Sequence, residues 1–241
     1  MCPINRQLTR LDALALLLVL LVAALLRLGN PGVVEFLHDE AMLSLLAQDM
    51  AAGKGVPLTG IPSSVGVPNP PISVYIMALP YALGADPQAA TLFVAALNVI
   101  GVGLLWLITY RYLGRLIALI AGLAYAVNPW ALLYSRKIWA QDFHTPLVLL
   151  TLGLGLYGFG ENKRWAQVLC LPVLIVALQI HFAAWALLPL YLWLLWLGRK
   201  NLSWRVLFLS FALAGLTLVP FLLGLTQTLQ ADPNRISNAL N

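Results

Sequence analysis

Seven apolar runs, separated by short polar or basic segments, dominate the chain. The first, from Ala13 to Leu26, follows Arg6 and Arg10 and stops at Arg27. The other six cover residues 90–110, 116–134, 146–160, 165–181, 183–198 and 204–224. About 20 apolar residues in a helix cross the hydrocarbon core of a bilayer. The pattern therefore predicts an all-α, polytopic membrane helix bundle with about seven spans.

The first apolar run has two interpretations. Its length is also typical of a signal peptide, but no A-x-A cleavage site follows it. A retained helix is therefore favoured over a cleaved signal. Both interpretations place the next segment outside the cytoplasm.

The segment between the first two spans, residues 28–89, is long and has internal order. Asp39 begins a helix-like stretch that ends at Gly53, in which Met42, Leu45, Leu46 and Met50 form one apolar stripe. We expect this helix to lie on the bilayer surface. Residues 53–71 hold four glycines and five prolines, which is typical of a loop. The run 72–83 is apolar but too short to span, so it predicts a second interfacial helix.

Composition agrees with a membrane protein. Of the 241 residues, 61% are hydrophobic and 10% are charged, against about 45–50% and about 25% in soluble domains. This excludes a soluble enzyme, a disordered chain and a nucleic-acid-binding domain. Cys2 and Cys170 are too few and too far apart to indicate a disulfide framework or a metal site.

The charges predict an orientation. With the N-terminus and the short loops after the second, fourth and sixth spans in the cytoplasm, nine of the 14 lysines and arginines lie inside. Seven of the nine acidic residues then lie outside, and the three histidines lie at or near the outer face. We therefore expect a multi-pass membrane protein with its N-terminus cytoplasmic and its C-terminus extracytoplasmic.

Three polar clusters fall at this outer face, and each has a structural and a functional interpretation. In His38-Asp39-Glu40 the acids either cap a helix or supply a general base or metal ligand. Arg136 and Lys137, in the connection that continues to Asp142 and His144, either contact lipid headgroups or bind an anionic substrate group. His181, at the turn after the fifth span, is either a structural hydrogen bonder or part of the same site.

The order of these features resembles the polyprenyl-phosphate-dependent glycosyltransferases of the GT-C fold, in particular the group related to protein O-mannosyltransferases and lipid A aminoarabinose transferases. The resemblance covers roughly residues 10–225 and rests on motifs in a fixed order. They are Asp39-Glu40, Asn69-Pro70-Pro71 with 72–84 behind it, Arg111-Tyr112-Leu113-Gly114, Asn128-Pro129, Tyr134-Ser135-Arg136 and Asp142. It implies a module over residues 1–225, an outer tail over 226–241 and a location in the bacterial cell membrane.

The resemblance also implies roles. Asp39 matches the position of the catalytic carboxylate, which deprotonates an acceptor hydroxyl while the sugar leaves its polyprenyl phosphate with inversion. Glu40 supports it, Arg136 and Lys137 contact the donor phosphate, and Asp142 is a second acid near the site. His38, Asn69, His144 and His181 are candidates for lining the site. The implied partners are a polyprenyl-phosphate-linked sugar, membrane lipids and a glycan, lipid or protein acceptor, with no nucleic acid.

Other functions stay open from the sequence. The cofactor question is also open: Asp39 and Asp142 are candidate ligands for a divalent cation, Mg or Mn. One alternative is a transporter or lipid-binding protein, but its spans are nearly free of charge, and Asn98 and Gln179 are their notable polar residues. Either amide is also able to bond a neighbouring helix. The last alternative is an inactive module that needs another chain to complete its site.

Overall fold

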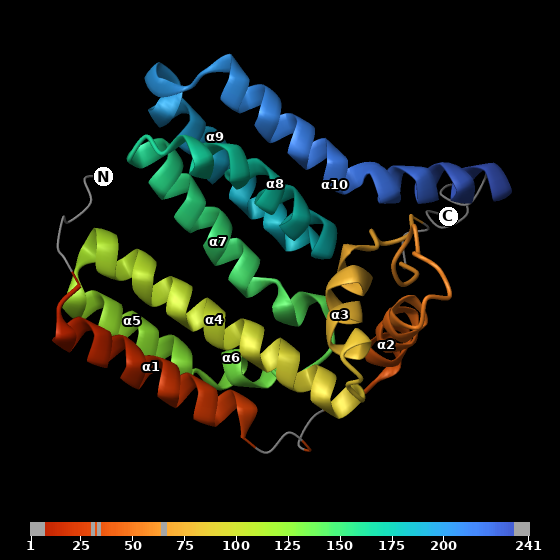
Figure 1. Ribbon diagram of the computed structural model, residues 1–241, viewed down its shortest axis with the longest axis horizontal. Coiled ribbons are helices and arrows are strands. Elements are labelled where there is room, and N and C mark those ends of the chain that lie inside the picture. The colour runs from red at the N-terminus through yellow and green to blue at the C-terminus, as the bar shows by residue number, and fades with distance from the viewer. Residues whose placement is uncertain (1–7, 30–31, 33–34, 64–66, 234–241) are drawn as a thin grey trace.

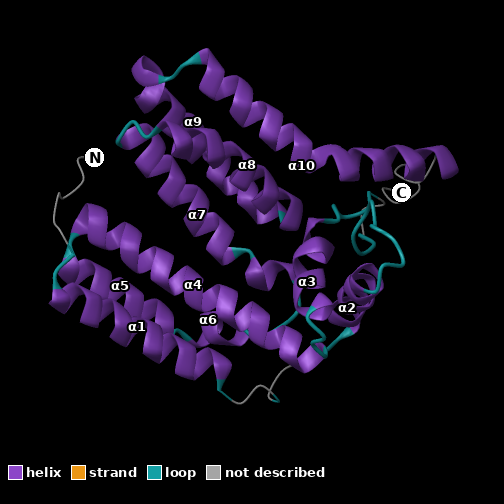
Figure 2. Ribbon diagram, in the orientation of Figure 1, coloured by secondary structure: helices purple, strands orange, loops and turns teal. Residues whose placement is uncertain are grey.

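The computed structural model describes residues 8–29, 32, 35–63 and 67–233, and every secondary-structure element in that part of the chain is helical (Figure 2). Within it, five segments are long and apolar enough to cross a membrane. These are α1 (Arg10–Leu28), α4 (Pro87–Leu113), Ala140–Gly160, Phe182–Asn201 and α10 (Trp204–Ala231). The all-α membrane bundle predicted from the sequence is confirmed. The other two expected spans correspond to the shorter apolar helices α5 (Arg115–Val127) and α8 (Arg164–Ile180).

Two of the long segments are composite. Ala140–Gly160 joins the 3₁₀ turn η1 (Ala140–Phe143), α7 (Thr145–Gly155) and the π-helical turn η2 (Leu156–Gly160). Phe182–Asn201 joins η3 (Phe182–Leu187), α9 (Leu188–Gly198) and η4 (Arg199–Asn201).

The expected span over residues 116–134 is interrupted. α5 ends at Val127, and the short helix α6 (Pro129–Tyr134) follows. Pro129 has no backbone N–H and disfavours helical geometry in the residue before it, so Asn128 is extended at φ −62° and ψ 121°. The Asn128 side chain then caps α6 by accepting from the backbone of Ala131 at 2.9 Å. The sequence interpretation of one continuous span was wrong at this position.

Helices α1, α4 and α5 pack side by side (Figure 1). Their shared core includes Val19, Val102 and Trp106. Gly122 of α5 allows close approach, because a Cβ there would lie 2.9 Å from Val19 Cγ1 and 3.1 Å from the Trp106 ring. Small residues at helix contacts are typical of membrane bundles.

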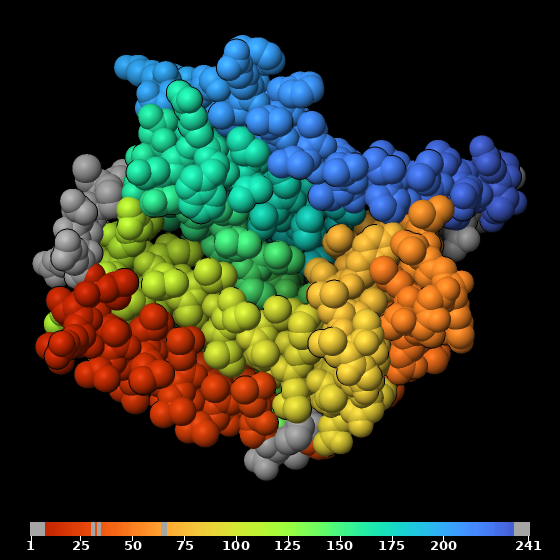
Figure 3. Space-filling model, in the orientation of Figure 1, coloured from red at the N-terminus to blue at the C-terminus, as the bar shows by residue number. Residues whose placement is uncertain are grey.

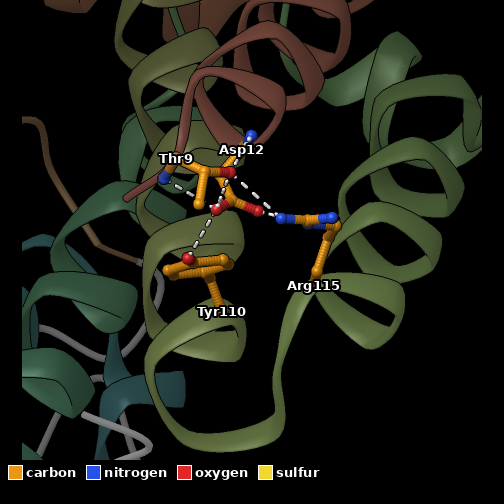
Figure 4. A network of polar contacts seen from close by, with 4 residues as sticks. All are labelled: Thr9, Asp12, Tyr110 and Arg115. Carbon is orange, nitrogen blue, oxygen red and sulfur yellow. Dashed lines mark hydrogen bonds and ion pairs between the residues drawn. The ribbon is translucent and has the colours of Figure 1, made fainter. Parts of the chain in front are cut away.

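A polar network holds one end of these three helices together (Figure 4). Thr9 and Asp12 form a capping box at the start of α1. The Asp12 carboxylate also accepts from the Tyr110 hydroxyl at 2.8 Å and forms an ion pair with Arg115. The first turn of α1 is thereby fixed to the last turn of α4 and the first of α5.

A second ion pair extends this polar end of the molecule. Glu161, in the turn after η2, binds the guanidinium of Arg111 and accepts from the Tyr112 hydroxyl at 2.8 Å. The Arg111 hydrogen bonds hold the pKa of the Glu161 carboxyl below its ordinary value. The loops expected in the cytoplasm therefore lie together, which is one requirement of the predicted topology.

Helices α7, α8, α9 and α10 form the second half of the bundle (Figure 1). Two interhelical bonds involve the amides noted in the sequence. Asn98 Nδ2 donates to the Asp142 carbonyl at 2.7 Å, and Gln179 Nε2 donates to Thr217 Oγ1 at 3.1 Å. Both amides thus bond a neighbouring segment of the bundle, as a structural role requires.

Helices α2 (His38–Ala51) and α3 (Ile72–Ala82) pack on each other at the other end of the molecule (Figures 1 and 3). Both were predicted from the apolar pattern and are confirmed. Gly53, at φ +73°, adopts a left-handed conformation just after α2.

The buried face of α2 agrees with the predicted stripe in part. Leu46 and Met50 of the stripe pack against the core, whereas Leu45 is 57% exposed. The most deeply buried residues are Leu43 and Ala47, which lie beside the stripe and belong to the same core as residues of α3. The buried face is shifted toward them because α3 packs on that side of α2.

Helix α10 changes direction along its length and crosses above α2 and α3 (Figures 1 and 3). Pro220 lies within it and removes one backbone hydrogen bond, a common cause of a bend. Beyond the bend, Gly224 contacts the loop between α2 and α3, because a Cβ there would lie 2.5 Å from the Leu58 carbonyl oxygen. The helix continues to Ala231, so part of the expected tail is helical, and residues 234–241 lie outside the described residues.

Candidate active site

Three neighbouring cavities lie where α2, α3, α6, η1 and the end of α8 meet. The polar cavity, about 460 Å³, is lined by Asp39, Ile61, Pro62, Ser63, Asn69, Ser73, Trp139, Ala140, Gln141, Gln179, Ile180, His181 and Phe182. The middle cavity, about 220 Å³, is lined by Leu37, His38, Asp39, Glu40, Lys137 and Trp139. The apolar cavity, about 700 Å³, is lined by Gly32, Glu35, Pro129, Leu132, Leu133, Arg136 and Lys137. Asp39 and Trp139 border the first two cavities, and Lys137 borders the last two.

Asp39 lies in the first turn of α2, between the polar and middle cavities. It is exposed, and no described residue hydrogen bonds or forms an ion pair with its carboxylate. The side chain is therefore free to accept a proton from a molecule in either cavity.

Glu40 has the structural role that the sequence offered as one alternative. It is buried, and its Oε2 accepts from the backbone N–H of Leu37 at 3.1 Å, which caps the start of α2. It also lines the middle cavity, as does His38. Glu40 thus fixes the helix turn that carries Asp39.

Lys137 supplies a buried cation. Its side chain is 9% exposed, its ammonium forms an ion pair with Glu35, and it lies 5.5 Å from the centre of the Tyr134 ring. The hydrogen bond with Glu35 raises the pKa of Lys137 above its ordinary value, so the ammonium stays charged at neutral pH. Arg136 lines the apolar cavity and donates from Nη2 to the Gly29 carbonyl at 2.9 Å.

Asp142 and His144 lie behind the cavities, which neither of them lines. Both are buried, and Asp142 Oδ2 and His144 Nε2 have no hydrogen-bond partner among the described residues. The His144 ring meets that of His181 edge to face, with 6.1 Å between ring centres. His181 itself lines the polar cavity.

The described residues do not supply a metal ligand set. No group of three or more histidine, cysteine, aspartate or glutamate side chains within the described ranges is close enough to hold a metal ion. Asp39 and Asp142 are a pair at most, and Asp142 does not reach the cavity that Asp39 lines.

Asn69 lines the polar cavity and fixes its loop. Its Nδ2 donates to the Ile61 carbonyl at 3.0 Å, and its backbone pairs with Gly60 and Ile61 across the loop. The Tyr75 hydroxyl holds the same loop from α3 by donating to the Pro57 carbonyl at 2.6 Å. These bonds make the loop a wall of the cavity.

Sequence reasoning missed several residues of the site. Glu35, the partner of Lys137, was one of the acidic residues expected outside and had no further role. Trp139, Ser73, Gln141, Gln179 and Phe182 were not expected to line a cavity. The available signal for four of them, Trp139, Gln141, Gln179 and Phe182, was their proximity in sequence to Lys137 or His181.

The helix bundle, with a carboxylate, a buried cation and an apolar cavity grouped at one end, is typical of membrane enzymes that act on lipid-linked substrates. Residues 68–223, well over half of the chain, match the family described as dolichyl-phosphate-mannose-protein mannosyltransferase, and the chain belongs to this family of GT-C glycosyltransferases. No curated protein and no solved structure gives a match. The matched range begins after α2, so Asp39 and Glu40 precede it.

Family membership defines the activity at a coarse level. The chain is a multi-pass membrane glycosyltransferase of the mannosyltransferase type, which uses a polyprenyl-phosphate-linked sugar as its donor.

Proposed function

We propose that the protein transfers a sugar from a polyprenyl phosphate to an acceptor hydroxyl in one inverting step, with Asp39 as the general base. The observation that carries the proposal is the position of Asp39. Asp39, whose carboxylate has no partner among the described residues, borders both the polar cavity and the middle cavity, and Lys137 also lines the middle cavity. Such a displacement requires a base beside the attacking hydroxyl and a cation beside the departing phosphate.

The donor is assigned to the apolar and middle cavities. Pro129, Leu132 and Leu133 of α6 offer an apolar wall for the first isoprene units of the lipid. Lys137 borders both cavities, so a phosphate between them lies beside its ammonium, with Arg136 on the apolar side. The sugar then occupies the middle cavity, next to Asp39.

The chemistry balances in a single displacement. The acceptor oxygen forms a bond to the anomeric carbon while the bond from that carbon to the phosphate oxygen breaks. The electron pair of that bond stays on the phosphate, whose added charge Lys137 and Arg136 offset. The acceptor proton passes to the Asp39 carboxylate, and attack opposite the leaving group inverts the anomeric configuration.

The basic end of the bundle supports an outer location for the site. Arg111, Arg115 and Lys163 lie at the end held by the Asp12 and Glu161 networks, opposite α2 and α3. Because basic residues are in excess in cytoplasmic loops, this arrangement favours an extracytoplasmic location of the cavities.

The proposed function is tested with the purified chain in proteoliposomes, supplied with polyprenyl-phosphate mannose and a mixed pool of acceptors. We expect a glycosylated product whose new linkage is opposite in configuration to the donor linkage. The one-bond coupling between C1 and H1 of the transferred sugar, measured by NMR, reports this configuration. A product of retained configuration contradicts the single displacement. Transport of the substrate without any sugar transfer would contradict the conclusion that the protein is a glycosyltransferase.

A further inference from the structure

The polar cavity identifies the class of acceptor, an inference that rests on the proposed function. Among its lining residues, all of which the structure describes, Asp39 is the one carboxylate, and there is no lysine or arginine. An acceptor bearing a phosphate or carboxylate would approach Asp39 with no cation to offset the repulsion. The lining therefore favours an uncharged acceptor.

Three polar side chains of this cavity are each fixed by hydrogen bonding through one group, and each has a second group that bonds no described residue. Asn69 Nδ2 donates to the carbonyls of Ile61 and Pro62, at 3.0 and 3.4 Å, which leaves Oδ1. Gln179, 5% exposed, uses its Nε2 on Thr217, and its Oε1 has no partner among the described residues. His181 Nδ1 accepts from a backbone N–H of η3, which leaves the proton of the neutral ring on Nε2.

The remaining groups, Asn69 Oδ1, Gln179 Oε1 and His181 Nε2, suit a polyhydroxylated molecule. Two are acceptors and one is a donor, and the side chains of Ser73 and Gln141 in the same lining each both donate and accept. The adjacent hydroxyls of a sugar ring also each donate and accept. Because the first three are already held in place, binding costs little further side-chain entropy.

Two aromatic rings in the lining also suit a sugar. Trp139 and Phe182 line the same cavity, and Phe182 is 61% exposed. A pyranose has an apolar C–H face beside its polar edges, and an aromatic ring covers such a face well. A cavity of about 460 Å³ holds roughly 15 waters at about 30 Å³ each, which is space for one or two sugar rings.

We infer that the acceptor is a neutral glycan. Its terminal one or two sugar residues occupy the polar cavity between α3, η1 and the end of α8, with the attacking hydroxyl beside Asp39. Serine or threonine of a protein and phosphorylated sugars are the competing acceptors that the following experiment separates.

The test is saturation-transfer difference NMR on the detergent-solubilised chain without donor. The probes are mannobiose and cellobiose, compared with a serine- and threonine-containing octapeptide and with glucosamine 1-phosphate. We expect binding of a neutral disaccharide in preference to the other two. Phe182→Ala and Gln141→Ala should weaken that binding about fivefold or more, the effect of losing one good contact. Phe208→Ala and Gln230→Ala, exposed positions on α10 that line none of the three cavities, should leave it unchanged.

Preferred binding of the peptide or of the phosphorylated sugar overturns the inference, as does disaccharide binding that both cavity variants leave unaltered. The measurement needs no turnover, so it separates the two claims. Disaccharide binding by a chain that transfers no sugar would remove the proposed function alone. Transfer to a peptide by a chain that binds no saccharide would remove this inference alone.

Discussion

At the scale of single residues, Lys137 is the clearest electrostatic element of the site. A buried lysine persists when a partner offsets its desolvation, and Glu35 provides that partner. Lys137→Met should lower kcat by about 10²–10³-fold, the usual effect of removing one group that stabilises developing charge. Single-turnover transfer measures this loss.

The matched control is Lys137→Arg, which keeps the positive charge at the border of the two cavities. It should retain far more activity than Lys137→Met at equal thermal stability. Equal activity of the two variants would show that charge at this position does not matter.

In the proposed mechanism, Glu35 competes with the donor phosphate for the Lys137 ammonium. Glu35→Gln also removes the carboxylate partner of the buried Lys137, so we expect a lower melting temperature alongside the kinetic effect. We expect the donor KM to fall by about two- to fivefold, the range of partly exposed ion pairs, with a smaller change at high salt because of screening. An unchanged or higher donor KM at low salt would mean that Glu35 does not occupy the phosphate position.

At the scale of elements, α10 supports the polar cavity from outside. Gly224 lies against the backbone of Leu58, and the same loop continues through Gly60 to Asn69, which lines the cavity. Gly224→Ala places a methyl group 2.5 Å from the Leu58 carbonyl oxygen, a clash that only backbone movement relieves. We expect a higher acceptor KM and a lower melting temperature.

Gly215→Ala is the control on the same helix, because a Cβ there meets nothing within 4 Å. It should match the unaltered protein or be slightly more stable, since alanine favours the helix. If both variants behave alike, α10 does not support the loop.

The elements also show what the sequence can predict. Apolar periodicity identified α2, α3 and the bundle helices, because burial in lipid or against a neighbour needs a continuous apolar face. It missed the break at Asn128-Pro129, although proline is a strong local signal. It located the buried face of α2 only in part, through Leu46 and Met50 but not Leu43 and Ala47. The exact face depends on where α3 packs, and periodicity within one helix does not contain that information.

The site was predictable only in part. Asp39, Glu40, Lys137 and His181 were singled out by charge at the outer face and do come to neighbouring cavities. Glu35, Gln179 and Phe182 were not, because they acquire meaning from contacts between segments far apart in sequence. Asp142 and His144 were expected to line the site but lie behind its wall.

At the scale of the whole molecule, the topology makes a prediction. Lys54 is exposed in the turn after α2, and Asn201 is exposed in η4, just before α10. The loop after α2 and the start of α10 lie at opposite ends of the bundle (Figure 1). In a Cys2→Ser background, a membrane-impermeant maleimide added to intact cells should label Lys54→Cys and leave Asn201→Cys unlabelled until the membrane is opened. The reverse pattern would place the cavities on the cytoplasmic side.

The most direct test of the account replaces the carboxylate of Asp39 with an amide of the same size. Asp39→Asn should reduce kcat for transfer by about 10²–10⁴-fold, the range that general base catalysis supplies, while membrane insertion and donor binding persist. Asp49→Asn, on the same helix and paired only with the exposed Lys54, should transfer sugar at the original rate. Undiminished transfer by Asp39→Asn, or an equal loss in Asp49→Asn, would contradict the role of Asp39 as the base.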